Sequence, residues 1–505
     1  MARVGSLFVT ISAVAFVAVA VTGYAIYQHL DGNITKVQVG DLSGKTVYGA
    51  LDILVLGSQE RSGQKGFFGY EANPGTTNSD NLLLVHLDPT HTHAIVLSIP
   101  RDLFVYEPAC KERKYVGTSI WPAQVYPPGA IIDGALNIGG PTCAVKTVES
   151  LTGIKLDHVV VFDFNSFRTM VDALGGVEVC VPPGRGYHDG YSHLNLSPGL
   201  HKVTYDQALA YVRTRHGVGN GGDLGRIELQ QAFISSMVQK VNKDGLLNNI
   251  SSLYSVANTA TKALTVDQGL SSPIDLLHLA ESLAHLKSKD VSLITLPTTA
   301  DTYPGLSDHL MAVQPQDDVL YQMIRTGERW HGQLPTEPFA HIDVRVLNAT
   351  GQSGLAKRTA TALKKLGIQV ASVGDAPYTA TTTVDYSGTA QADSAYTLMT
   401  ALKSFPAAKN LLSEPAGQIG SPGPVTLVLG ADFTGVNPPA PAKSGQGTQA
   451  KPKQKKGTGG SSSGPATAVS KAAQNGPGAV QSRNAGANIC SGLPAAYAPG
   501  AAGPG

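Results

Sequence analysis

The chain has 505 residues, of which 42% are hydrophobic and 15% are charged, and it contains 56 glycines and 31 prolines. This length allows two or three domains with at least one sizeable core, and the glycine and proline enrichment predicts a long unstructured segment. Seven basic and no acidic residues follow Asp432, so the net charge of +1 leaves the rest of the chain negative. This distribution argues against a nucleic-acid-binding protein, whose folded part usually carries the positive charge.

An uncharged apolar run extends over 21 residues, from Leu7 to Tyr27. As a helix it would span roughly 30 Å, the thickness of a bilayer core. It is longer than the apolar part of a cleaved signal peptide, which is the alternative, and it ends in aromatic residues that suit the membrane interface. We therefore expect a single-pass transmembrane helix within residues 1–28. Arg3 favours a cytoplasmic N-terminus, which would place the bulk of the chain outside the cell membrane.

Residues 51–297 are predicted to form one α/β domain after a polar tether at residues 29–50. Short apolar runs typical of buried strands lie at 51–56, 82–87, 94–99, 159–161 and 177–179. Helical patterns alternate with these runs, and the last has apolar residues at helical spacing from Ile227 to Val241. Strands that alternate with helices predict a sheet in an α-β-α layered arrangement.

A second, smaller α/β domain is predicted over residues 341–436, after a mostly polar connector with some helix at 298–340. The expected elements are strands at 342–347, 368–373 and 425–429 and helices at 355–366 and 395–402. Residues 437–505 consist mainly of Gly, Pro, Ala, Ser and Lys. Such a segment buries too little apolar surface to offset its ordering entropy, so we expect it to be disordered.

Polar clusters stand at the ends of several elements of the first domain. They contain Arg61, Arg101, Arg213, Arg215, Arg226, Asp80, Asp102 and Asp223. Ligands bind at strand ends in open α/β sheets, so these side chains could converge on one crevice. The planar fork of arginine matches phosphate oxygens and aspartate supplies the hard oxygens that Mg²⁺ prefers, which suits a pyrophosphate. A single such arginine is more often engaged in a surface ion pair or a cap, and the residues alone leave that alternative open.

Three histidines, His86, His91 and His93, alternate near the end of a predicted strand. We expect them to face solvent rather than to bind a metal, because imidazole suits zinc or copper better than Mg²⁺.

Six segments resemble the successive motifs of the LytR-CpsA-Psr family and occur in that family's order. They are LVLGSQER, SDNLLLVHLDP, VLSIPRD, VVVFDFNSFRTMVDALGGVEV, ALAYVRTRH and DLGRIELQQ. Residues 344–433, with VLNATGQSGLA and VTLVLGADF, resemble the LytR C-terminal domain that often follows. The cysteine pattern and the tail resemble those of actinobacterial members. The resemblance implies an α-β-α core that holds a polyprenyl pyrophosphate at the outer face of the membrane.

The implied activity is that of a phosphotransferase. It would transfer a polyprenyl-pyrophosphate-linked glycopolymer to peptidoglycan and release polyprenyl phosphate, with Mg²⁺ as the cofactor. Asp80 and Asp102 match the metal-binding acids of the family. The positions that match pyrophosphate-binding or nearby residues are Arg61, Arg101, Arg213, Arg215, Arg226 and Gln230. Of the matched residues, Arg101, Arg213, Arg215 and Asp102 are expected to act in catalysis, whereas Asp223 is less certain and could only hold an arginine.

The lipid of such a donor needs an apolar channel. The expected wall is the apolar face of the helix at 227–241, with Phe233, Ile234, Met237 and Val238, although each of these residues is more often ordinary core. Two rival functions use the same motifs. One is a protein that binds polyprenyl pyrophosphate or acts in regulation, as the label "transcriptional attenuator" of some relatives suggests. The other is a pyrophosphatase that uses water as the acceptor.

Two positions depart from the family pattern. Leu229 stands where the family often has arginine, and Ile131–Asp133 replaces a Lys-Ile-Asn run before the Gly-Gly-Pro at residues 139–141. One positive group and one amide are thus missing, so we expect the headgroup preference or the affinity to differ.

The four cysteines lie far apart in the sequence, and no C-x-x-C spacing suggests a zinc site. In an exported domain such cysteines are compatible with disulfides, whereas four free thiols would fit a cytosolic protein. Cys110 and Cys143 lie in one loop-rich region and are expected to pair. Cys180 would pair with Cys490 or remain free.

Overall fold

The computed structural model describes residues 20–40, 42, 49–58, 78–111, 120–121, 130–219, 221–244, 250–284, 286–300, 309–411, 423–438 and 480–495. They divide into two compact units. The first contains the described residues up to 312, residues 324–330 and those from 481 onward, and the second contains residues 313–323 and those from 331 to 480. Residue Arg61 and the first part of the predicted span Leu7–Tyr27 lie outside the described residues.

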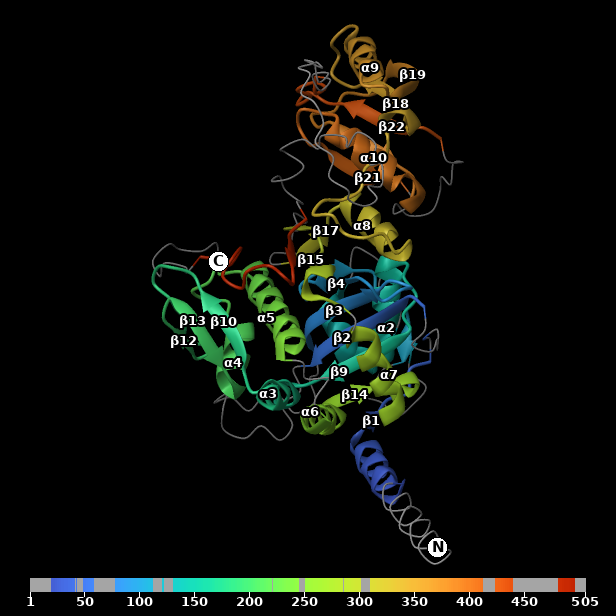
Figure 1. The fold of residues 1–505 in the computed structure, drawn as a ribbon. Coiled ribbons are helices and arrows are strands. Elements are labelled where there is room, and N and C mark those ends of the chain that lie inside the picture. Colours follow the sequence, from blue (N-terminus) through green and yellow to red (C-terminus); the bar gives the residue numbers. More distant parts are fainter. Residues whose placement is uncertain are drawn as a thin grey trace, which may run out of the picture. The chain divides into compact units, whose positions relative to one another are not determined.

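The first unit is built on an eight-stranded mixed sheet with the strand order β1-β14-β9-β2-β3-β4-β15-β23 (Figure 1). Its strands are β1 Thr35–Lys36, β2 Leu51–Ser58, β3 Ser79–Leu87, β4 Ala94–Ile99, β9 His158–Phe162, β14 Leu264–Val266, β15 Val291–Thr295 and β23 Ser482–Asn484. Strands β2, β3 and β4 are antiparallel neighbours, whereas β9 joins β2 and β15 joins β4 in parallel. The four runs predicted between residues 51 and 161 therefore form the centre of this sheet.

Helices cover both faces of the sheet, as the α-β-α prediction requires (Figure 1). Helix α2 (Ala135–Thr152) covers one face, and α5 (Asp223–Asp244) and α7 (Pro273–Ala284) cover the other. Because side chains alternate along a strand, β2 supplies both faces. On the face that α5 covers, Leu51 belongs to an apolar cluster against which Val238 of α5 packs. Leu54 is also fully buried but lies outside that cluster.

A smaller group of strands packs beside α5. Strand β10 (Val177–Val181) pairs with β13 (Gly199–Val203), and β11 (Tyr187–Asp189) pairs with β12 (Leu194–Leu196). Together with α3 (Phe164–Ala173), α4 (Tyr205–Arg213) and one face of α5 they enclose a second apolar cluster. The strand predicted at 177–179 exists, but it belongs to the β10–β13 pair and not to the main sheet.

The first unit also contains a further helix and three short strand pairs. They are α6 (Ile250–Ala263) and the strand pairs β5 (Phe104–Val105) with β8 (Ala130–Ile131), β6 (Cys110–Lys111) with β7 (Ile120–Trp121), and β16 (Thr298–Ala300) with β17 (Leu310–Ala312).

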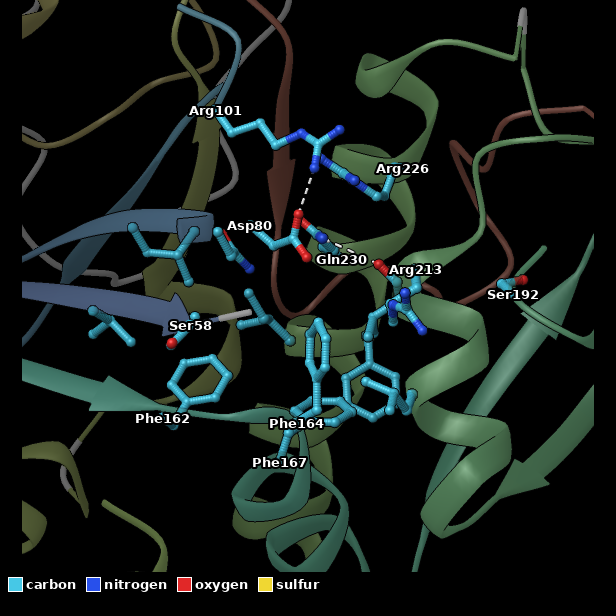
Figure 2. A pocket seen from close by; sticks show the side chains of 18 of the residues that line it. Ser58, Asp80, Arg101, Phe162, Phe164, Phe167, Ser192, Arg213, Arg226 and Gln230 are labelled. Atoms are coloured by element: carbon cyan, nitrogen blue, oxygen red, sulfur yellow. Dashed lines mark hydrogen bonds and ion pairs between the residues drawn. The ribbon is translucent and has the colours of Figure 1, made fainter. Parts of the chain in front are cut away.

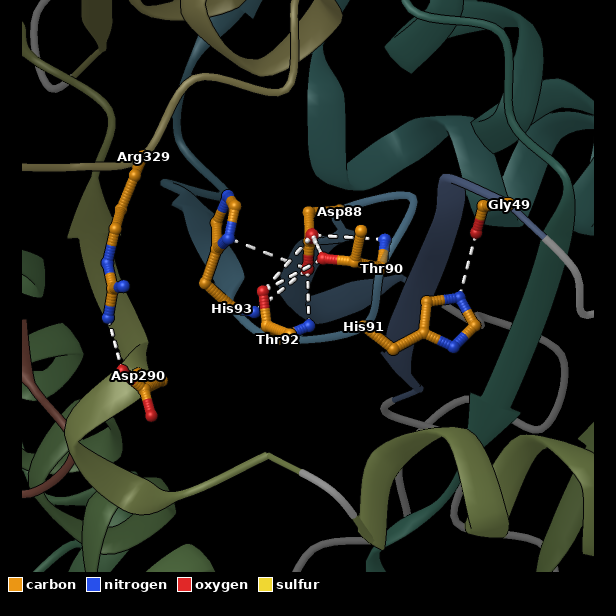
Figure 3. A network of polar contacts seen from close by, with 8 residues as sticks. All are labelled: Gly49, Asp88, Thr90, His91, Thr92, His93, Asp290 and Arg329. Carbon is orange, nitrogen blue, oxygen red and sulfur yellow. Dashed lines mark hydrogen bonds and ion pairs between the residues drawn. The ribbon is translucent and has the colours of Figure 1, made fainter.

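The turn between β3 and β4 is fixed by Asp88 (Figure 3). Its carboxylate accepts hydrogen bonds from the backbone N–H groups of Thr92 at 2.6 Å, His93 at 2.8 Å and Thr90 at 3.0 Å. Burial alone would raise the pKa of Asp88, but these bonds outweigh it and hold the pKa well below its usual range. His91 contacts the carbonyl oxygen of Gly49 through Nε2 at 2.8 Å.

The expectation that all three histidines of this region face solvent is wrong for His86. Its side chain is 3% exposed, and its Nδ1 lies 2.8 Å from Oδ1 of Asp52. The carboxylate of Asp52 on the neighbouring strand β2 offsets the cost of burying the imidazole.

Residues 480–495 are folded, which corrects the expectation of a tail disordered throughout 437–505. Strand β23 pairs antiparallel with β15, and Ala485 is fully buried. A disulfide joins Cys490 to Cys180. The composition of the segment is poor in apolar residues, but backbone hydrogen bonds to a sheet edge and one covalent bond do not depend on composition. Residues 439–479 and 496–505 lie outside the described residues.

The second unit has a five-stranded sheet with the order β19-β18-β22-β20-β21. Its elements are β18 Asp343–Asn348, β19 Gln369–Asp375, β20 Thr383–Tyr386, β21 Ala407–Asn410, β22 Val425–Leu429, α8 Gln316–Arg325, α9 Leu355–Lys365 and α10 Ala392–Thr400. The predicted strands and helices of this domain are all present within a few residues. Helix α8 falls in the expected polar connector, but its Val319 and Leu320 are fully buried, so that part of 298–340 is core.

Among the described residues, no helix combines the length and the apolar character needed to cross a membrane.

Candidate functional site

Three strand ends of the main sheet meet at one edge, where β2 ends, β3 begins and β4 ends. The register pairs Ser58 with Ser79 and Leu82 with Ile99. This arrangement brings together Asp80 at the start of β3 and Arg101 and Asp102 just after β4.

Arg101 binds both of these acids. Its Nη1 donates to Oδ1 of Asp80 at 2.5 Å, and its Nε lies 3.2 Å from Oδ1 of Asp102. Burial lowers the pKa of Arg101, but the carboxylates of Asp80, Asp102 and Asp223 outweigh it and raise the pKa overall. Burial, followed by the negative charge of Asp223, raises the pKa of Asp102 against the opposing effect of the arginines.

Arg213 and Arg215 reach the same site from the end of α4. The helix ends at Arg213, and Thr214 is already extended, with φ −62° and ψ 128°. The backbone N–H groups of Arg215 and His216 then donate to Oδ2 of Asp189 at 3.1 and 3.2 Å. Because the helix ends between the two arginines, residues two apart in the sequence can face one cavity.

Asp223 begins α5 and lies among three arginines. It forms an ion pair with Arg226, and its Oδ1 lies 3.7 Å from Nε of Arg101 and 3.9 Å from Nε of Arg215. Burial lowers the pKa of Arg226, although the charge of Asp223 opposes this effect. The sequence left open whether Asp223 only forms an ion pair with one arginine. The structure places its carboxylate within ion-pair distance of three arginines.

The Nε atoms of Arg101, Arg215 and Arg226 are buried and make no hydrogen bond among the described residues. Buried donors of this kind are costly unless a ligand or water uses them. Both carboxylate oxygens of Asp223 also lack a hydrogen bond, and Nε of Arg101 lies 3.2 Å from Oδ1 of Asp102, so the unsatisfied polar atoms belong to the charged cluster as a whole.

Asp80 and four arginines form the charged end of a cavity of about 530 Å³, whereas Asp102 and Asp223 do not line it (Figure 2). Asp80, Arg101, Arg213, Arg215, Arg226 and Gln230 all line it. Gln230 donates to the carbonyl oxygen of Val212 at 3.1 Å and so ties α5 to α4. The guanidinium of Arg213 lies over the ring of Phe164, 4.9 Å from its centroid.

The rest of the cavity is apolar. Its aromatic wall comes from the end of β9 and from α3, and it consists of Phe162, Phe164 and Phe167 (Figure 2). Phe233, Ile234 and Met237 of α5 also line the cavity, as expected. Val238 does not line it, because it packs against the cluster under the main sheet, on an adjacent face of the helix. Val238 therefore lies outside the cavity wall, and the lipid contacts of Phe233, Ile234 and Met237 stay a prediction.

Sequence reasoning missed the aromatic wall and Asp189. The three phenylalanines fall within six residues at a strand-to-helix junction, and this spacing could have indicated a wall beside the strand ends. Asp189 gave no such signal, because its role depends on backbone N–H groups more than 20 residues away. Arg61 lies outside the described residues, so its part in the site stays a prediction.

The two departures from the family pattern differ in their position. Leu229 is fully buried in the second apolar cluster and does not line the cavity, so an arginine there would have no direct route to the ligand. Asp133 lies beside the charged cluster. Its backbone N–H donates to the carbonyl oxygen of Arg101 at 3.3 Å, and its Oδ2 accepts a hydrogen bond from Asn78 at 3.2 Å. Burial raises the pKa of Asp133 to about 6.

The structure joins Cys110 to Cys143, the pair expected from the sequence, and it also joins Cys180 to Cys490. Next to the first disulfide lies Glu107, which is 1% exposed, with Oε1 3.8 Å from Sγ of Cys143. Burial raises the pKa of Glu107 to about 7.

Known proteins resemble this chain over both units. The model of the LytR_cpsA_psr family matches residues 14–325, and that of LytR_C, described as LytR cell envelope-related transcriptional attenuator, matches residues 341–433. The cell wall biosynthesis protein LcpA of Corynebacterium glutamicum is 28% identical over 410 residues, which cover 72% of this chain and 76% of that protein.

Two further likenesses involve TagT of Bacillus subtilis. This protein, named a polyisoprenyl-teichoic acid–peptidoglycan teichoic acid transferase, is 29% identical over 214 residues, 43% of this chain and 60% of that protein. The solved structure of TagT bound to LI-WTA is 23% identical, with a TM-score of 0.40, and the match covers 58% of this chain and 98% of that chain. The match to the LytR_cpsA_psr family spans more than half of this chain. The chain therefore belongs to the LytR-CpsA-Psr family and carries a LytR C-terminal domain.

Proposed function

We propose that the protein is a phosphotransferase that moves a glycopolymer from a polyprenyl pyrophosphate carrier to peptidoglycan and releases polyprenyl phosphate. One observation carries this proposal. A single cavity has four arginines at one end and an aromatic and aliphatic wall at the other. A pyrophosphate headgroup suits the first part and a prenyl chain suits the second. The named activity of TagT supports the same class of reaction.

The reaction is a displacement at the phosphorus next to the sugar. A hydroxyl oxygen of peptidoglycan forms a bond to this phosphorus and gives up its proton to water. The bond to the oxygen bridging the two phosphates breaks, and polyprenyl phosphate leaves with the electron pair of that bond. Arg213, Arg215 and Arg226 would stabilise the charge that develops on the equatorial and leaving oxygens. Asp223 would hold Arg215 and Arg226 at the separation that this charge requires.

Mg²⁺ is the cofactor that we propose, with Asp80 and Asp102 as its protein ligands. Both are hard carboxylate donors at adjacent strand ends, and Mg²⁺ in phosphate sites usually takes one or two carboxylates with phosphate and water. Their shared contact with Arg101 fits this role, because the arginine balances the acids while no cation is bound. Bound Mg²⁺ would neutralise charge on the pyrophosphate.

We also propose that residues 7–27 anchor the chain in the cell membrane and that the rest is extracytoplasmic. The two disulfides support this location, since such bonds persist in oxidising compartments. The membrane would deliver the lipid-linked donor.

Product analysis by mass spectrometry tests the proposal and separates it from its rivals. The purified protein is given a polyprenyl pyrophosphate–linked sugar with and without peptidoglycan fragments. We expect a phosphodiester-linked adduct and polyprenyl phosphate only when the fragments are present. Equal release in water alone would instead identify a pyrophosphatase, and binding without turnover would identify a carrier or regulatory protein.

A further inference from the structure

The segment 480–495, here called the C-terminal strap, is attached to the first unit at several points. Strand β23 extends the main sheet, and the Cys180–Cys490 disulfide ties the strap to strand β10. Two side chains of helix α5 donate hydrogen bonds to the backbone of the strap. Ser235 donates to the carbonyl oxygen of Ala485 at 2.8 Å, and Gln239 donates to the same oxygen at 2.7 Å.

The end of the strap reaches two parts that support the arginine site. The hydroxyl of Tyr187 in β11 donates to the carbonyl oxygen of Pro494 at 2.6 Å. The backbone N–H of Gly219 donates to the carbonyl oxygen of Ala495 at 2.8 Å. Both contacts fall at residues that belong to neither the cavity lining nor the charged cluster.

Gly219 belongs to the glycine loop, defined as residues 217–222, of which 220 lies outside the described residues. This loop joins Arg215 to Asp223, and so it connects the two halves of the charged cluster. Gly217 has φ +84°, and a Cβ there would lie 2.5 Å from the carbonyl oxygen of His188 in β11. The loop therefore packs directly against β11, the strand that the strap holds through Tyr187.

Strand β11 also fixes Arg215. Asp189, the last residue of β11, accepts the hydrogen bond from the backbone N–H of Arg215 at 3.1 Å. Two routes thus lead from the strap to the site. One passes through Tyr187 and Asp189 to Arg215. The other passes through Gly219, where a Cβ would lie 3.6 Å from Cα of Gly225 in the first turn of α5, the helix that begins with Asp223.

We propose that the C-terminal strap is a positioning element for the phosphate-binding arginines. By holding β11 and the glycine loop it fixes Arg215 and Asp223 in the arrangement that meets the charge developing at phosphorus. The lipid-binding wall lies on α3, β9 and α5. Leu493 of the strap packs against the apolar cluster that includes the wall residue Phe233, but none of the hydrogen bonds of the strap described above reaches a residue that lines the cavity. This role rests on the proposed phosphotransferase function, and it predicts that the strap affects turnover more than donor binding.

Three changes to the full chain test the proposal. They are a stop after residue 479, the double change Cys180→Ser with Cys490→Ser, and Tyr187→Phe, which removes one hydroxyl. We expect kcat to fall roughly tenfold or more in the first two, because small misplacement of catalytic groups is costly. The Kd for a short-chain polyprenyl pyrophosphate should change by less than about threefold. Tyr187→Phe should lower kcat by a smaller factor in the same direction.

A matched control separates positioning from general destabilisation. Val203 is fully buried in the same cluster as Tyr187, and none of the strap contacts described above involves it. We expect Val203→Ala to lower the melting temperature without changing kcat at a temperature where the protein stays folded. Addition of a synthetic peptide of residues 480–495 under oxidising conditions should restore most of the turnover of the truncated chain.

Hydrogen exchange at the backbone amides of residues 215–219 provides a readout that does not need activity. Loss of the strap should accelerate this exchange while that of the main sheet's central strands stays slow. A truncated chain that is folded and keeps normal kcat and normal exchange would overturn the proposal. The proposal would also be overturned if the truncated chain lost donor binding by the same factor as turnover. It would equally be overturned if kcat fell with the melting temperature in Val203→Ala as it does in the strap variants. Should wild-type protein fail to transfer at all, the proposed function is wrong, and the exchange result alone decides the role of the strap.

Discussion

At the scale of single residues, the central feature is that one helix end brings two arginines to the lining of one cavity. Arg213 ends α4 with its guanidinium over Phe164, and Arg215 follows an extended Thr214. The glycine-rich run after His216 favoured such an ending, and the arginine motif suggested its purpose. Sequence reasoning therefore found the pair, but it could not give Asp189, which holds the backbone of Arg215.

Substitution of these arginines should reduce turnover far more than stability. We expect Arg213→Ala and Arg215→Ala each to cost about 3–4 kcal/mol of transition-state stabilisation, comparable to the loss of other preorganised charge-stabilising donors. Arg213→Lys should still bind the donor but turn it over slowly, because it keeps the charge and loses the planar fork. Steady-state kinetics and thermal melts check this. A variant that unfolds but has normal specific activity in its folded fraction would show that the arginine is structural.

Removal of either proposed metal ligand should abolish Mg²⁺-dependent turnover. We expect Asp80→Asn and Asp102→Asn to be folded by circular dichroism, because each acid lies at a strand end and is only partly buried. Calorimetric titration with Mg²⁺ in the presence of the donor should show weakened binding. Full turnover in both variants, or activity that a chelator does not affect, would exclude the assignment.

Glu107 should make the stability of the protein depend on pH. Burial raises its pKa from 4.5 to about 7, so folding favours the protonated form. The folded state then binds more protons than the unfolded state between these values, and stability falls as the pH rises through this window. We expect Glu107→Gln to be more stable than the wild type at pH 8, by on the order of 2 kcal/mol, and nearly equal at pH 4.5.

Urea unfolding at the two pH values measures this difference. The exposed Glu178→Gln serves as a control and should show none. An equal effect of Glu107→Gln at both pH values would mean that packing, and not the charge of the carboxylate, sets the stability.

At the scale of elements, α5 has three roles on different faces. Its first turn supplies Asp223 and Arg226, one face with Ile234 and Met237 lines the cavity, and Ser235 holds the strap. The helical period of 3.6 residues separates these faces. The apolar spacing in the sequence predicted the helix, but it could not distinguish Met237, which lines the cavity, from Val238, which packs on the sheet.

A polar group on the cavity face of α5 should weaken binding of the lipid but not of its headgroup. We expect Met237→Gln, a change of similar size, to raise the Kd for a long-chain polyprenyl pyrophosphate by about tenfold, which corresponds to about 1.4 kcal/mol. The Kd for inorganic pyrophosphate should stay the same. Loss of affinity for both ligands would mean that the change distorts the helix, and an unchanged Kd for both would place the lipid elsewhere.

The sequence predicted central elements better than edge elements. The runs at 51–56, 82–87 and 94–99 are apolar except for one residue each, Asp52, His86 and Ser98, because their strands are buried on both faces, and this pattern needs no knowledge of partners. Strand β23 has no such pattern, since Ser482–Asn484 is polar and is held by pairing with β15. Edge strands of this kind depend on long-range contacts that a local pattern does not contain.

At the scale of the whole molecule, the first unit closes its fold through residues far apart in the sequence. The Cys180–Cys490 disulfide joins positions 310 residues apart and brings the end of the chain back to the first unit. The composition of residues 437–505 predicted disorder, because it lacks the apolar residues from which a core is built. Residues 480–495 are instead held by a disulfide, a short backbone pairing and side-chain hydrogen bonds from Ser235, Gln239 and Tyr187.

The central claim is that the protein transfers a phosphate together with the glycopolymer, and the position of a phosphorus label tests it most directly. A donor is prepared with ³²P in the phosphate next to the sugar, and it is incubated with the protein, Mg²⁺ and peptidoglycan. Attack at this phosphorus predicts that the label moves into the wall material and that unlabelled polyprenyl phosphate is released. Label that remains on the lipid as pyrophosphate would show cleavage of the sugar–oxygen bond, and it would contradict the account.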